Sequence, residues 1–248
     1  MSASEYNQKF EVKTPKSVYP PREDTLLLAS CIPKPQNGLK KALEIGSGSG
    51  FLSMVIASKG WKVTSIDVNP LAVAATKANI QENGHFDIHC IEGSFDEIEY
   101  LEEGMFDLIV WNLPYVTVPK SGPFLEPMEE ASMLDLGTDG WSSELRSYLE
   151  SHPNMLSRKG CVLLLYRTYP DSPSKPEDWL KSGWTSRKMA QKIMGDEMLC
   201  VYSHWRPWGG LEPIQIDTIK STMDYNFNKN EVVQRIIANK QIGGRGRR

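Results

Sequence analysis

The chain has 248 residues, a formal net charge of −3 at pH 7 and a pI of about 5.9. This length can form one well-buried α/β domain with appendages, and the acidic balance argues against a protein that coats nucleic acid without sequence preference. The first thirty residues contain no apolar signal segment, and no apolar run reaches the roughly 18 residues of a membrane-spanning helix. We therefore expect a cytoplasmic protein that makes no membrane contact.

The cysteines and histidines are few and far apart in the sequence. No C-x-x-C pair occurs, and three of the four cysteines lie in apolar, strand-like runs: Cys90, Cys161 and Cys200. This pattern predicts buried thiols in a reducing compartment and no metal site.

The chain begins with a polar, Pro-rich segment, residues 1–38, which contains the run Val-Tyr-Pro-Pro-Arg-Glu-Asp-Thr at 18–25. Its two prolines stop any helix, Asp24 or Thr25 is predicted to cap the next one, and residues 26–32 continue that helix. The run is either an ordinary helix start or a lid whose Thr25 reaches a bound ligand. The sequence alone does not favour one interpretation over the other.

The next segment, 42–45, is a short apolar run typical of a buried parallel strand. It leads into Gly46, Gly48 and Gly50 and then into an amphipathic stretch at 51–59, which predicts a helix. A strand, a glycine-rich turn and a helix form half of a nucleoside-binding unit, in which the ligand contacts bare backbone at the carboxyl end of the strand.

The spacing of these glycines disfavours a dinucleotide. A G-x-G-x-x-G fingerprint would place its third glycine at position 51, which is Phe51. Glu44 disfavours a pyrophosphate and favours a cationic ligand, and Asp67, at the end of a strand at 63–67, can accept from both ribose hydroxyls. S-adenosylmethionine carries an ammonium and a sulfonium, so it suits this site better than NAD. The alternative is a plain strand-to-helix turn with a solvated Asp67.

The remaining segments alternate between strand and helix patterns. Gly93, Ser94 and Phe95 follow the third strand and are expected to border the adenine of the ligand. Residues 116–140 form a long loop rich in Pro and Gly, which is typical of a functional loop. The predicted elements are a helix at 71–82, a strand at 87–91, a short acidic helix at 96–103, a strand at 106–111, a helix at 142–156, a strand at 161–166, a helix at 177–181 and an antiparallel hairpin of strands at 184–193 and 198–204.

The fourth strand runs directly into Asn112-Leu113-Pro114-Tyr115, a candidate substrate site. An amide or exocyclic amine nitrogen is a poor nucleophile because its lone pair is delocalised, so its methylation requires acceptors that hold the N–H groups and aim the nitrogen. The Asn112 side chain and the Leu113 carbonyl can be these acceptors. Pro114 keeps Leu113 extended, and Tyr115 offers a flat face to a planar group. The alternative is a strand-ending Asn followed by a turn proline.

These motifs together resemble one family. Asn-Leu-Pro-Tyr at 112–115, after Leu-Glu-Ile-Gly-Ser-Gly-Ser-Gly at 43–50, is similar to the class I S-adenosylmethionine-dependent methyltransferases that modify planar nitrogens. The run at 18–25 and Leu-Gly-Thr-Asp-Gly at 136–140 narrow the resemblance to the HemK-like glutamine methyltransferases. In particular, the chain resembles the short archaeal and eukaryotic branch, which lacks a separate N-terminal helical domain. The similarity extends over residues 17–205.

The resemblance implies a Rossmann-like α/β fold, with a mostly parallel seven-stranded sheet, an antiparallel C-terminal hairpin and helices on both faces. It implies a methyltransferase domain at 39–205, preceded by an N-terminal segment or lid at 1–38, and S-adenosylmethionine as the cofactor. By position, the cofactor would contact Thr25, Glu44, Gly46, Gly48, Gly50, Asp67, Ser94, Phe95 and Asn112, and the substrate amide would be held by Asn112, Leu113, Pro114 and Tyr115.

In this family the substrate is the glutamine of a Gly-Gly-Gln tripeptide in a peptide-chain release factor, and the short branch works with a small zinc-binding activator protein. Two positions depart from the family pattern. Leu113 replaces a proline, and Ser94 replaces an acidic residue that accepts from the adenine amino group, a loss for which Asp96 could compensate. The extension at 206–248 has no counterpart, and it ends in a basic tail that contains Arg245, Arg247 and Arg248.

Three functions remain open at this point. The first is methylation of a release-factor glutamine, hence a role in translation termination. The second is methylation of a nucleic-acid exocyclic amine, adenine N6 or guanine N2, which requires the base to leave its stack and the phosphate backbone to be held. The acidic charge weighs against nucleic acid and the basic tail weighs for it. The third is a cofactor-binding scaffold without catalysis, whose segment 211–241 docks a partner. The sequence favours the first.

Overall fold

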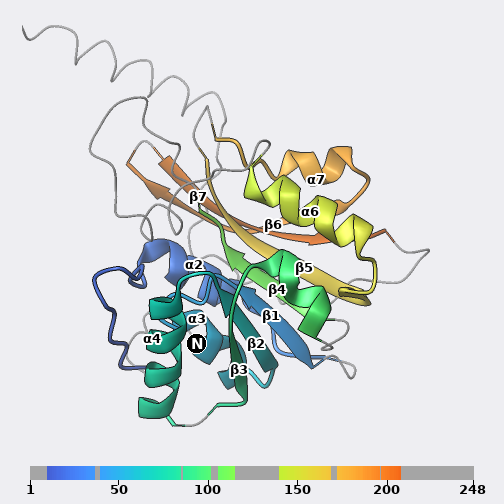
Figure 1. The fold of residues 1–248 in the computed structure, drawn as a ribbon. Helices are drawn as coiled ribbons and strands as arrows, with labels where there is room; N and C mark the ends of the chain where they lie inside the picture. Colours follow the sequence, from blue (N-terminus) through green and yellow to red (C-terminus); the bar gives the residue numbers. More distant parts are fainter. Residues whose placement is uncertain are drawn as a thin grey trace, which may run out of the picture.

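The computed structural model describes residues 10–36, 40–84, 86–101, 106–114, 140–168, 172–195 and 197–207. Within these ranges, helices and strands alternate along the chain (Figure 1). The elements are α2 (Glu23–Cys31), β1 (Lys41–Ile45), α3 (Phe51–Ser58), β2 (Lys62–Asp67), α4 (Pro70–Glu82), β3 (Ile88–Glu92), the 3₁₀ helix η1 (Phe95–Leu101), β4 (Phe106–Asn112), α6 (Trp141–Ser151), β5 (Leu156–Thr168), α7 (Glu177–Lys181), β6 (Thr185–Met194) and β7 (Glu197–Trp205).

In the described part of the chain, seven strands form one mixed sheet in the order β3-β2-β1-β4-β5-β7-β6. The strands from β3 to β5 pair in parallel, whereas β7 pairs antiparallel with both β5 and β6. The predicted Rossmann-like sheet with its antiparallel hairpin is therefore confirmed. The strand order reverses direction between β1 and β4, and open α/β sheets bind ligands outside the carboxyl ends of the strands at such a point.

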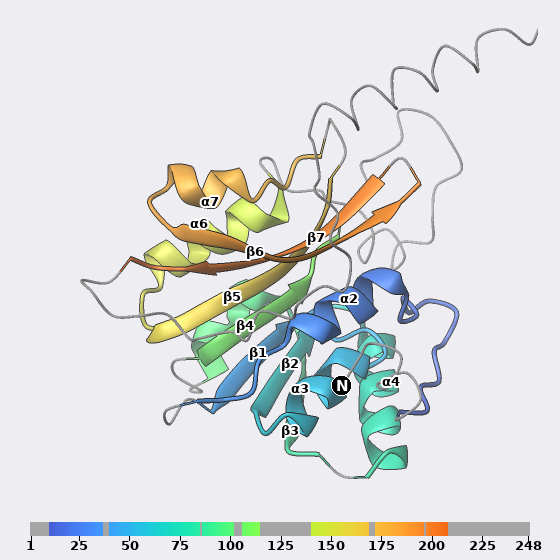
Figure 2. The ribbon, with the colours of Figure 1, turned by 180° about the vertical axis from the view of Figure 1, so that it is seen from behind.

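The alternation of side chains along each strand divides the core into two layers. In β4, Leu108 and Val110 belong to one layer, and Ile109 and Trp111 belong to the other. Helices α2, α3 and α4 cover the first face of the sheet, and α6 and α7 cover the second (Figures 1 and 2). The central strands are buried on both sides, which explains why the sequence shows them as nearly continuous apolar runs.

Helix α2 begins earlier than predicted. Its N-cap is Arg22, not Asp24 or Thr25, and Arg22 is extended (φ −127°, ψ −168°). The Thr25 hydroxyl, at the third helical position, accepts a hydrogen bond from the Arg22 N–H (3.4 Å), so the helix can start directly after the two prolines. The shift places Asp24 inside the first turn, where its side chain is buried.

Three other boundaries also differ from the predictions. The acidic stretch forms the 3₁₀ helix η1 rather than an α-helix at 96–103. Helix α6 ends at Ser151, because Pro153 disfavours a helical conformation of His152. Strand β5 extends beyond its apolar centre because its two ends pair with β4 and β7. The predicted loop at 116–140 lies outside the described residues except Gly140, and so does the C-terminal extension except 206–207.

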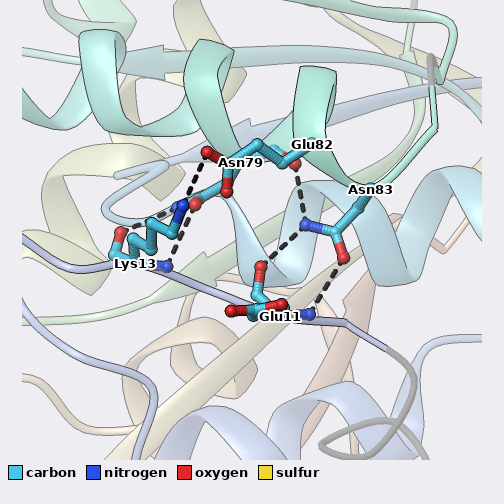
Figure 3. Close-up of polar contacts among 5 residues, drawn as sticks. All are labelled: Glu11, Lys13, Asn79, Glu82 and Asn83. Atoms are coloured by element: carbon cyan, nitrogen blue, oxygen red, sulfur yellow. Dashed lines mark hydrogen bonds and ion pairs between the residues drawn. The ribbon is translucent and has the colours of Figure 1, made fainter.

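The N-terminal segment crosses α4 in an extended form before it reaches α2, and we call its residues 10–19 the strap. Asn79 of α4 and Asn83, the C-cap of that helix, bind the main chain of Lys13 and Glu11, respectively (Figure 3). In both pairs the side-chain amide accepts from the N–H and donates to the carbonyl, at 2.7–3.0 Å. The two asparagines therefore satisfy the strap backbone as a neighbouring strand would.

Within the described ranges, no helix has the length and apolarity needed to cross a lipid bilayer. In the same part of the chain, no group of three or more His, Cys, Asp or Glu side chains is placed to hold a metal ion. The cysteines are free thiols, and burial raises the pKa of Cys161 to about 12.

Candidate active site

A pocket lies at the carboxyl ends of β1, β2 and β4, where the strand order reverses. The loop between β1 and α3 forms one side of it, and a second side comes from the end of the strap and the first turn of α2. A third side consists of residues 93–95, 111–114 and Trp141. The pocket therefore combines the glycine loop, the predicted lid and the candidate substrate motif, which the sequence places in separate segments.

The glycine loop presents bare backbone to this pocket. Gly46 and Gly48 line it and have positive φ angles of 72° and 53°, which glycine adopts without strain. Gly50 also has a positive φ (80°), but it is not a lining residue. A Cβ at Gly50 would lie 2.9 Å from the Thr76 side chain, so this glycine allows the start of α3 to approach α4. Two of the three glycines thus face the pocket, and the third serves packing.

The Glu44 side chain is buried beside the pocket, with 1% of its surface exposed. The Ser53 hydroxyl donates to Oε2, whereas Oε1 has no hydrogen-bond partner among the described residues. Burial raises the pKa of Glu44, the hydrogen bond from Ser53 opposes this, the charge of Asp67 adds to it, and together they bring the pKa to about 8. A buried oxygen without a donor is costly, so this carboxyl fits the ammonium of a bound ligand.

Asp67 ends β2 beside the glycine loop. Its Oδ2 accepts a hydrogen bond from the Gly48 N–H and its Oδ1 accepts from the Asn69 N–H, both at 2.9 Å. Burial raises the pKa of Asp67, and these two backbone hydrogen bonds oppose that effect. They also fix the plane of the carboxylate while each oxygen keeps a further lone pair. Such a group can accept from two neighbouring ribose hydroxyls.

An aromatic wall closes another side of the pocket. It consists of Phe95, Trp111 and Trp141, with ring centroids 5.3 Å apart for Phe95 and Trp111 and 6.1 Å apart for the two tryptophans. Flat apolar faces of this kind suit the adenine of a nucleoside. Phe95 was predicted at this position from the sequence. The two tryptophans that pack beside Phe95 were not predicted.

Ser94 lines the pocket beside Phe95, as predicted. Its N–H donates to the Glu97 carboxylate (2.8 Å). Asp96, one of the two alternatives raised for the missing acidic residue, is exposed and does not line the pocket. The first turn of η1 brings Glu97, and not Asp96, back over Ser94.

Asn112 is the last residue of β4, and among the described residues only the NH₂ group of its side-chain amide has hydrogen-bond partners. Nδ2 donates to Oδ2 of Asp24 (3.2 Å) and lies 3.5 Å from the Thr25 hydroxyl. Oδ1 is buried and has no hydrogen-bond partner within the described part of the chain. Because buried acceptors in native proteins are nearly always paired, this oxygen marks a place where a ligand N–H can bind.

Of the other predicted site residues, three line the pocket and one lies outside the described residues. Thr25, in the first turn of α2, borders the pocket, and its hydroxyl donates to Asp24 (3.1 Å). Leu113 and Pro114 also line the pocket. The Leu113 side chain is 1% exposed and packs in the second core layer, where an apolar residue other than proline is accommodated. Tyr115 lies outside the described residues.

Among the pocket residues that sequence reasoning did not assign to the site are Tyr19, Asp24, Trp111 and Trp141. Tyr19 and Asp24 lie in the run at 18–25 that drew attention to Thr25, and the Tyr19 hydroxyl donates to Oδ2 of Asp24 (3.0 Å). The carboxylate of Asp24, in the same short run as Tyr19 and two prolines, could have been recognised from the sequence as a candidate pocket residue. Its contact with Asn112 was not visible, because 88 residues separate the two positions.

A sheet of this order, with an acidic nucleoside pocket at its reversal point, defines the class I S-adenosylmethionine-dependent methyltransferases, whose cofactor is S-adenosylmethionine. The family model of the methyltransferase small domain matches residues 13–128. A protein of Methanocaldococcus jannaschii with the provisional name protein N5-glutamine methyltransferase is 30% identical over 202 residues, which are 79% of this chain and 95% of that protein. The chain therefore belongs to this family of methyltransferases, in its HemK-like branch.

Other relatives share shorter regions or the fold alone. A release factor glutamine methyltransferase of Shewanella oneidensis is 32% identical over 99 residues, 39% of this chain and 34% of that protein. A tRNA1(Val) (adenine(37)-N6)-methyltransferase of a Flavobacteriaceae bacterium is 31% identical over 115 residues, 44% of this chain and 46% of that protein. The crystal structure of the hMettl16 catalytic domain with the MAT2A 3′UTR hairpin 1 has a TM-score of 0.59 and 14% identity, over 82% of this chain and 77% of that one, and shows the shared fold.

Proposed function

We propose that this methyltransferase acts on a planar NH₂ group, and that its substrate is the glutamine side-chain amide of a Gly-Gly-Gln tripeptide in a peptide-chain release factor. The observation that carries the proposal is the buried, unpartnered Oδ1 of Asn112 at the end of β4. An acceptor in this position can hold one N–H of the substrate, which leaves the nitrogen lone pair oriented for attack. The Leu113 carbonyl is the second acceptor in the proposal.

The same pocket geometry supports the proposed set of cofactor-binding residues. S-adenosylmethionine, when bound, supplies an electrophilic methyl group on a sulfonium. Glu44 holds the ammonium through its unpartnered Oε1, Asp67 accepts from the ribose hydroxyls, and the backbone of Gly46 and Gly48 lets the ligand approach closely. No strong general base is required at the substrate, because a methylated amide nitrogen is cationic and loses its proton readily.

The relatives support a protein substrate. The M. jannaschii protein, aligned over most of both chains, carries the name of a protein glutamine methyltransferase, and the S. oneidensis relative carries that of a release factor methyltransferase. We extend the proposal to a small zinc-binding activator protein as a partner and to a cytoplasmic, translation-termination role. Higher activity of the enzyme when it is co-expressed with such an activator protein would support the proposed partner.

Substitution of Asn112 by Ala tests the proposed role directly. We expect kcat to fall by about two to three orders of magnitude, the scale on which one preorganised polar contact acts, while the cofactor Kd stays nearly unchanged. Kinetics with radiolabelled cofactor and equilibrium binding measure the two quantities. A loss in kcat of less than about tenfold would show that Asn112 does not have the proposed catalytic role.

The substrate is tested with labelled cofactor and two forms of a release-factor domain, one with Gly-Gly-Gln and one with its Gln replaced by Glu. We expect label only in the first form. In host lysate, the labelled band should disappear after protease treatment and survive nuclease treatment.

A second candidate is methylation of a nucleic-acid exocyclic amine, because an aminopurine also presents a planar NH₂. The similarity to the tRNA1(Val) (adenine(37)-N6)-methyltransferase favours it over part of the chain. Nuclease-sensitive label, together with a steep loss of RNA affinity on addition of salt, would establish this function instead.

A further inference from the structure

The carboxylate of Asp24 is buried against the proposed catalytic amide. Asp24 lies in the first turn of α2, with 3% of its surface exposed. Its Oδ1 accepts from the Thr25 N–H (2.6 Å) and hydroxyl (3.1 Å), and its Oδ2 accepts from the Tyr19 hydroxyl (3.0 Å) and from Nδ2 of Asn112 (3.2 Å). These contacts hold both carboxylate oxygens in place.

A fixed carboxylate selects one of the two orientations of the Asn112 amide. An ionised carboxylate only accepts hydrogen bonds, whereas an amide has a donor end and an acceptor end of nearly the same shape. If the Asn112 amide were turned over, its oxygen would face an oxygen of Asp24, and the hydrogen bonds from Nδ2 to Asp24 and to the Thr25 hydroxyl would be lost. The Thr25 hydroxyl offers no replacement donor, since it already donates to Asp24.

We infer that Asp24 is a positioning residue that orients the Asn112 amide so that its carbonyl, and not its NH₂, meets the substrate. This inference rests on the proposed function, in which the substrate contributes an N–H. It adds to that function the basis of substrate choice. The site would accept a substrate that donates an NH₂, and not one that offers a carbonyl, because of Asp24, a residue of α2 that need not touch the substrate.

The isosteric Asp24→Asn substitution tests the inference. The oxygen of the introduced amide stays with the Thr25 N–H, because its NH₂ would there meet another donor. Its NH₂ therefore faces Nδ2 of Asn112, and two donors in contact favour inversion of the Asn112 amide. We expect kcat to fall about 100-fold, as when an acceptor of the transition state is lost, with the cofactor Kd changed by less than about threefold.

A swapped pair separates orientation from general damage to the fold. Asn112→Asp alone places two carboxylates against each other and should also reduce kcat. In the double variant Asp24→Asn/Asn112→Asp, the amide at position 24 donates to the carboxylate at position 112, whose second oxygen can again accept from the substrate. We expect kcat at least about tenfold above that of Asp24→Asn. A purely structural role of Asp24 predicts no such recovery.

Glu23→Gln is the matched control, because Glu23 is an exposed carboxylate in the same helical turn. It removes one negative charge near the start of α2 and should leave kcat unchanged. NMR of the Asn112 side-chain amide provides a readout without substrate: its NH₂ signals should shift and exchange faster in Asp24→Asn, but not in Glu23→Gln.

Two results would overturn the inference: an Asp24→Asn enzyme that keeps the wild-type kcat, or a double variant no more active than either single variant. Failure of the proposed function looks different. In that case the wild-type protein does not methylate the Gly-Gly-Gln domain, while the NMR signals of Asn112 still report whether Asp24 orients the amide.

Discussion

At the scale of single residues, Glu44 makes ligand binding in the pocket depend on pH. It is almost fully buried, it lies near the second carboxylate Asp67, and its pKa is raised to about 8 chiefly by burial. Without a cation beside it, the carboxyl is therefore mostly protonated at neutral pH. A bound ammonium stabilises the ionised form and lowers this pKa, so the proton must leave when the ligand binds.

Cofactor binding should consequently become tighter as the pH rises toward 8. Between about pH 6 and pH 7, where ligand-free Glu44 holds its proton, we expect the Kd to fall by up to about tenfold, the limit for release of one proton. Calorimetry in buffers of different ionisation enthalpy measures both the affinity and the proton release. Glu44→Gln cannot ionise and should abolish the pH slope, and a slope that persists in this variant would assign the proton to another group.

At the scale of elements, the strap depends on α4. Asn79 is buried, and its Nδ2 donates to the carbonyl of Ser49 in the glycine loop (2.8 Å) in addition to the strap. Asn83, which is half-buried, contacts the strap at Glu11 and α4 at the Asn79 carbonyl (Figure 3). Asn79 thus connects the strap, α4 and the glycine loop, whereas Asn83 connects only the strap and α4.

These two asparagines should therefore differ in their effect on the pocket. Asn79→Ala leaves the Ser49 carbonyl and the Lys13 main chain without their side-chain partners, and we expect cofactor affinity to fall by about 1–3 kcal/mol, the scale of buried polar groups left unpaired. Asn83→Ala should increase hydrogen exchange at the Glu11 amide and leave cofactor affinity unchanged. Exchange mass spectrometry and equilibrium binding measure both effects. Equal losses of affinity in the two variants would show that the strap alone, and not the glycine loop, carries the effect.

At the scale of the whole molecule, a buried polar network joins the antiparallel edge of the sheet to the helices of the second face. His204 of β7 is fully buried, with Nδ1 2.7 Å from the Ser186 hydroxyl and Nε2 2.9 Å from the Tyr166 hydroxyl. The Tyr166 hydroxyl is in turn 2.7 Å from that of Ser142, at the start of α6. Burial lowers the pKa of His204 to about 3, so the network requires a neutral imidazole.

Acid should therefore destabilise this protein through His204. Between its unfolded pKa near 6.5 and its folded pKa near 3, the unfolded chain binds a proton that the folded protein does not, so the free energy of unfolding falls as the pH falls. From pH 7 to pH 5 the loss should be about 2 kcal/mol.

Urea unfolding of the wild type and of His204→Gln at the two pH values measures this contribution. The free-energy difference between the two proteins should shrink by that amount at the lower pH, because the variant lacks the titrating group. Glu44, whose raised pKa gives the opposite slope between pH 4.5 and 8, is present in both proteins and cancels. A difference independent of pH would contradict the assignment.

Much of the fold was predictable because its signals are local. Apolar runs of strand length, Asn69-Pro70 before α4 and the Gly195 turn before β7 define the elements without reference to distant residues. Three of the predicted polar residues, Glu44, Asp67 and Asn112, lie near or at the ends of parallel strands. Parallel strands bring their carboxyl ends to one edge, so topology alone places these side chains together.

Other features depended on how the elements pack. No local pattern indicates that α2 lies where Asp24 meets Asn112, that Trp141 joins the wall of Phe95, or that Gly50 faces α4 instead of the pocket. Likewise, the start of α2 at Glu23 follows from a hydrogen bond between Arg22 and Thr25 that competes with the expected cap. Each of these outcomes is decided by side chains that meet in space.

By itself, the sequence determined the order of strands and helices, the glycine loop and the carboxylate and amide chemistry at the strand ends, because backbone propensity and apolar periodicity act over a few residues. The tertiary structure decided which end of the Asn112 amide is occupied and which residues close the pocket. Those properties arise from contacts between segments as many as 88 residues apart, whose relative positions only the packed sheet and its helices establish.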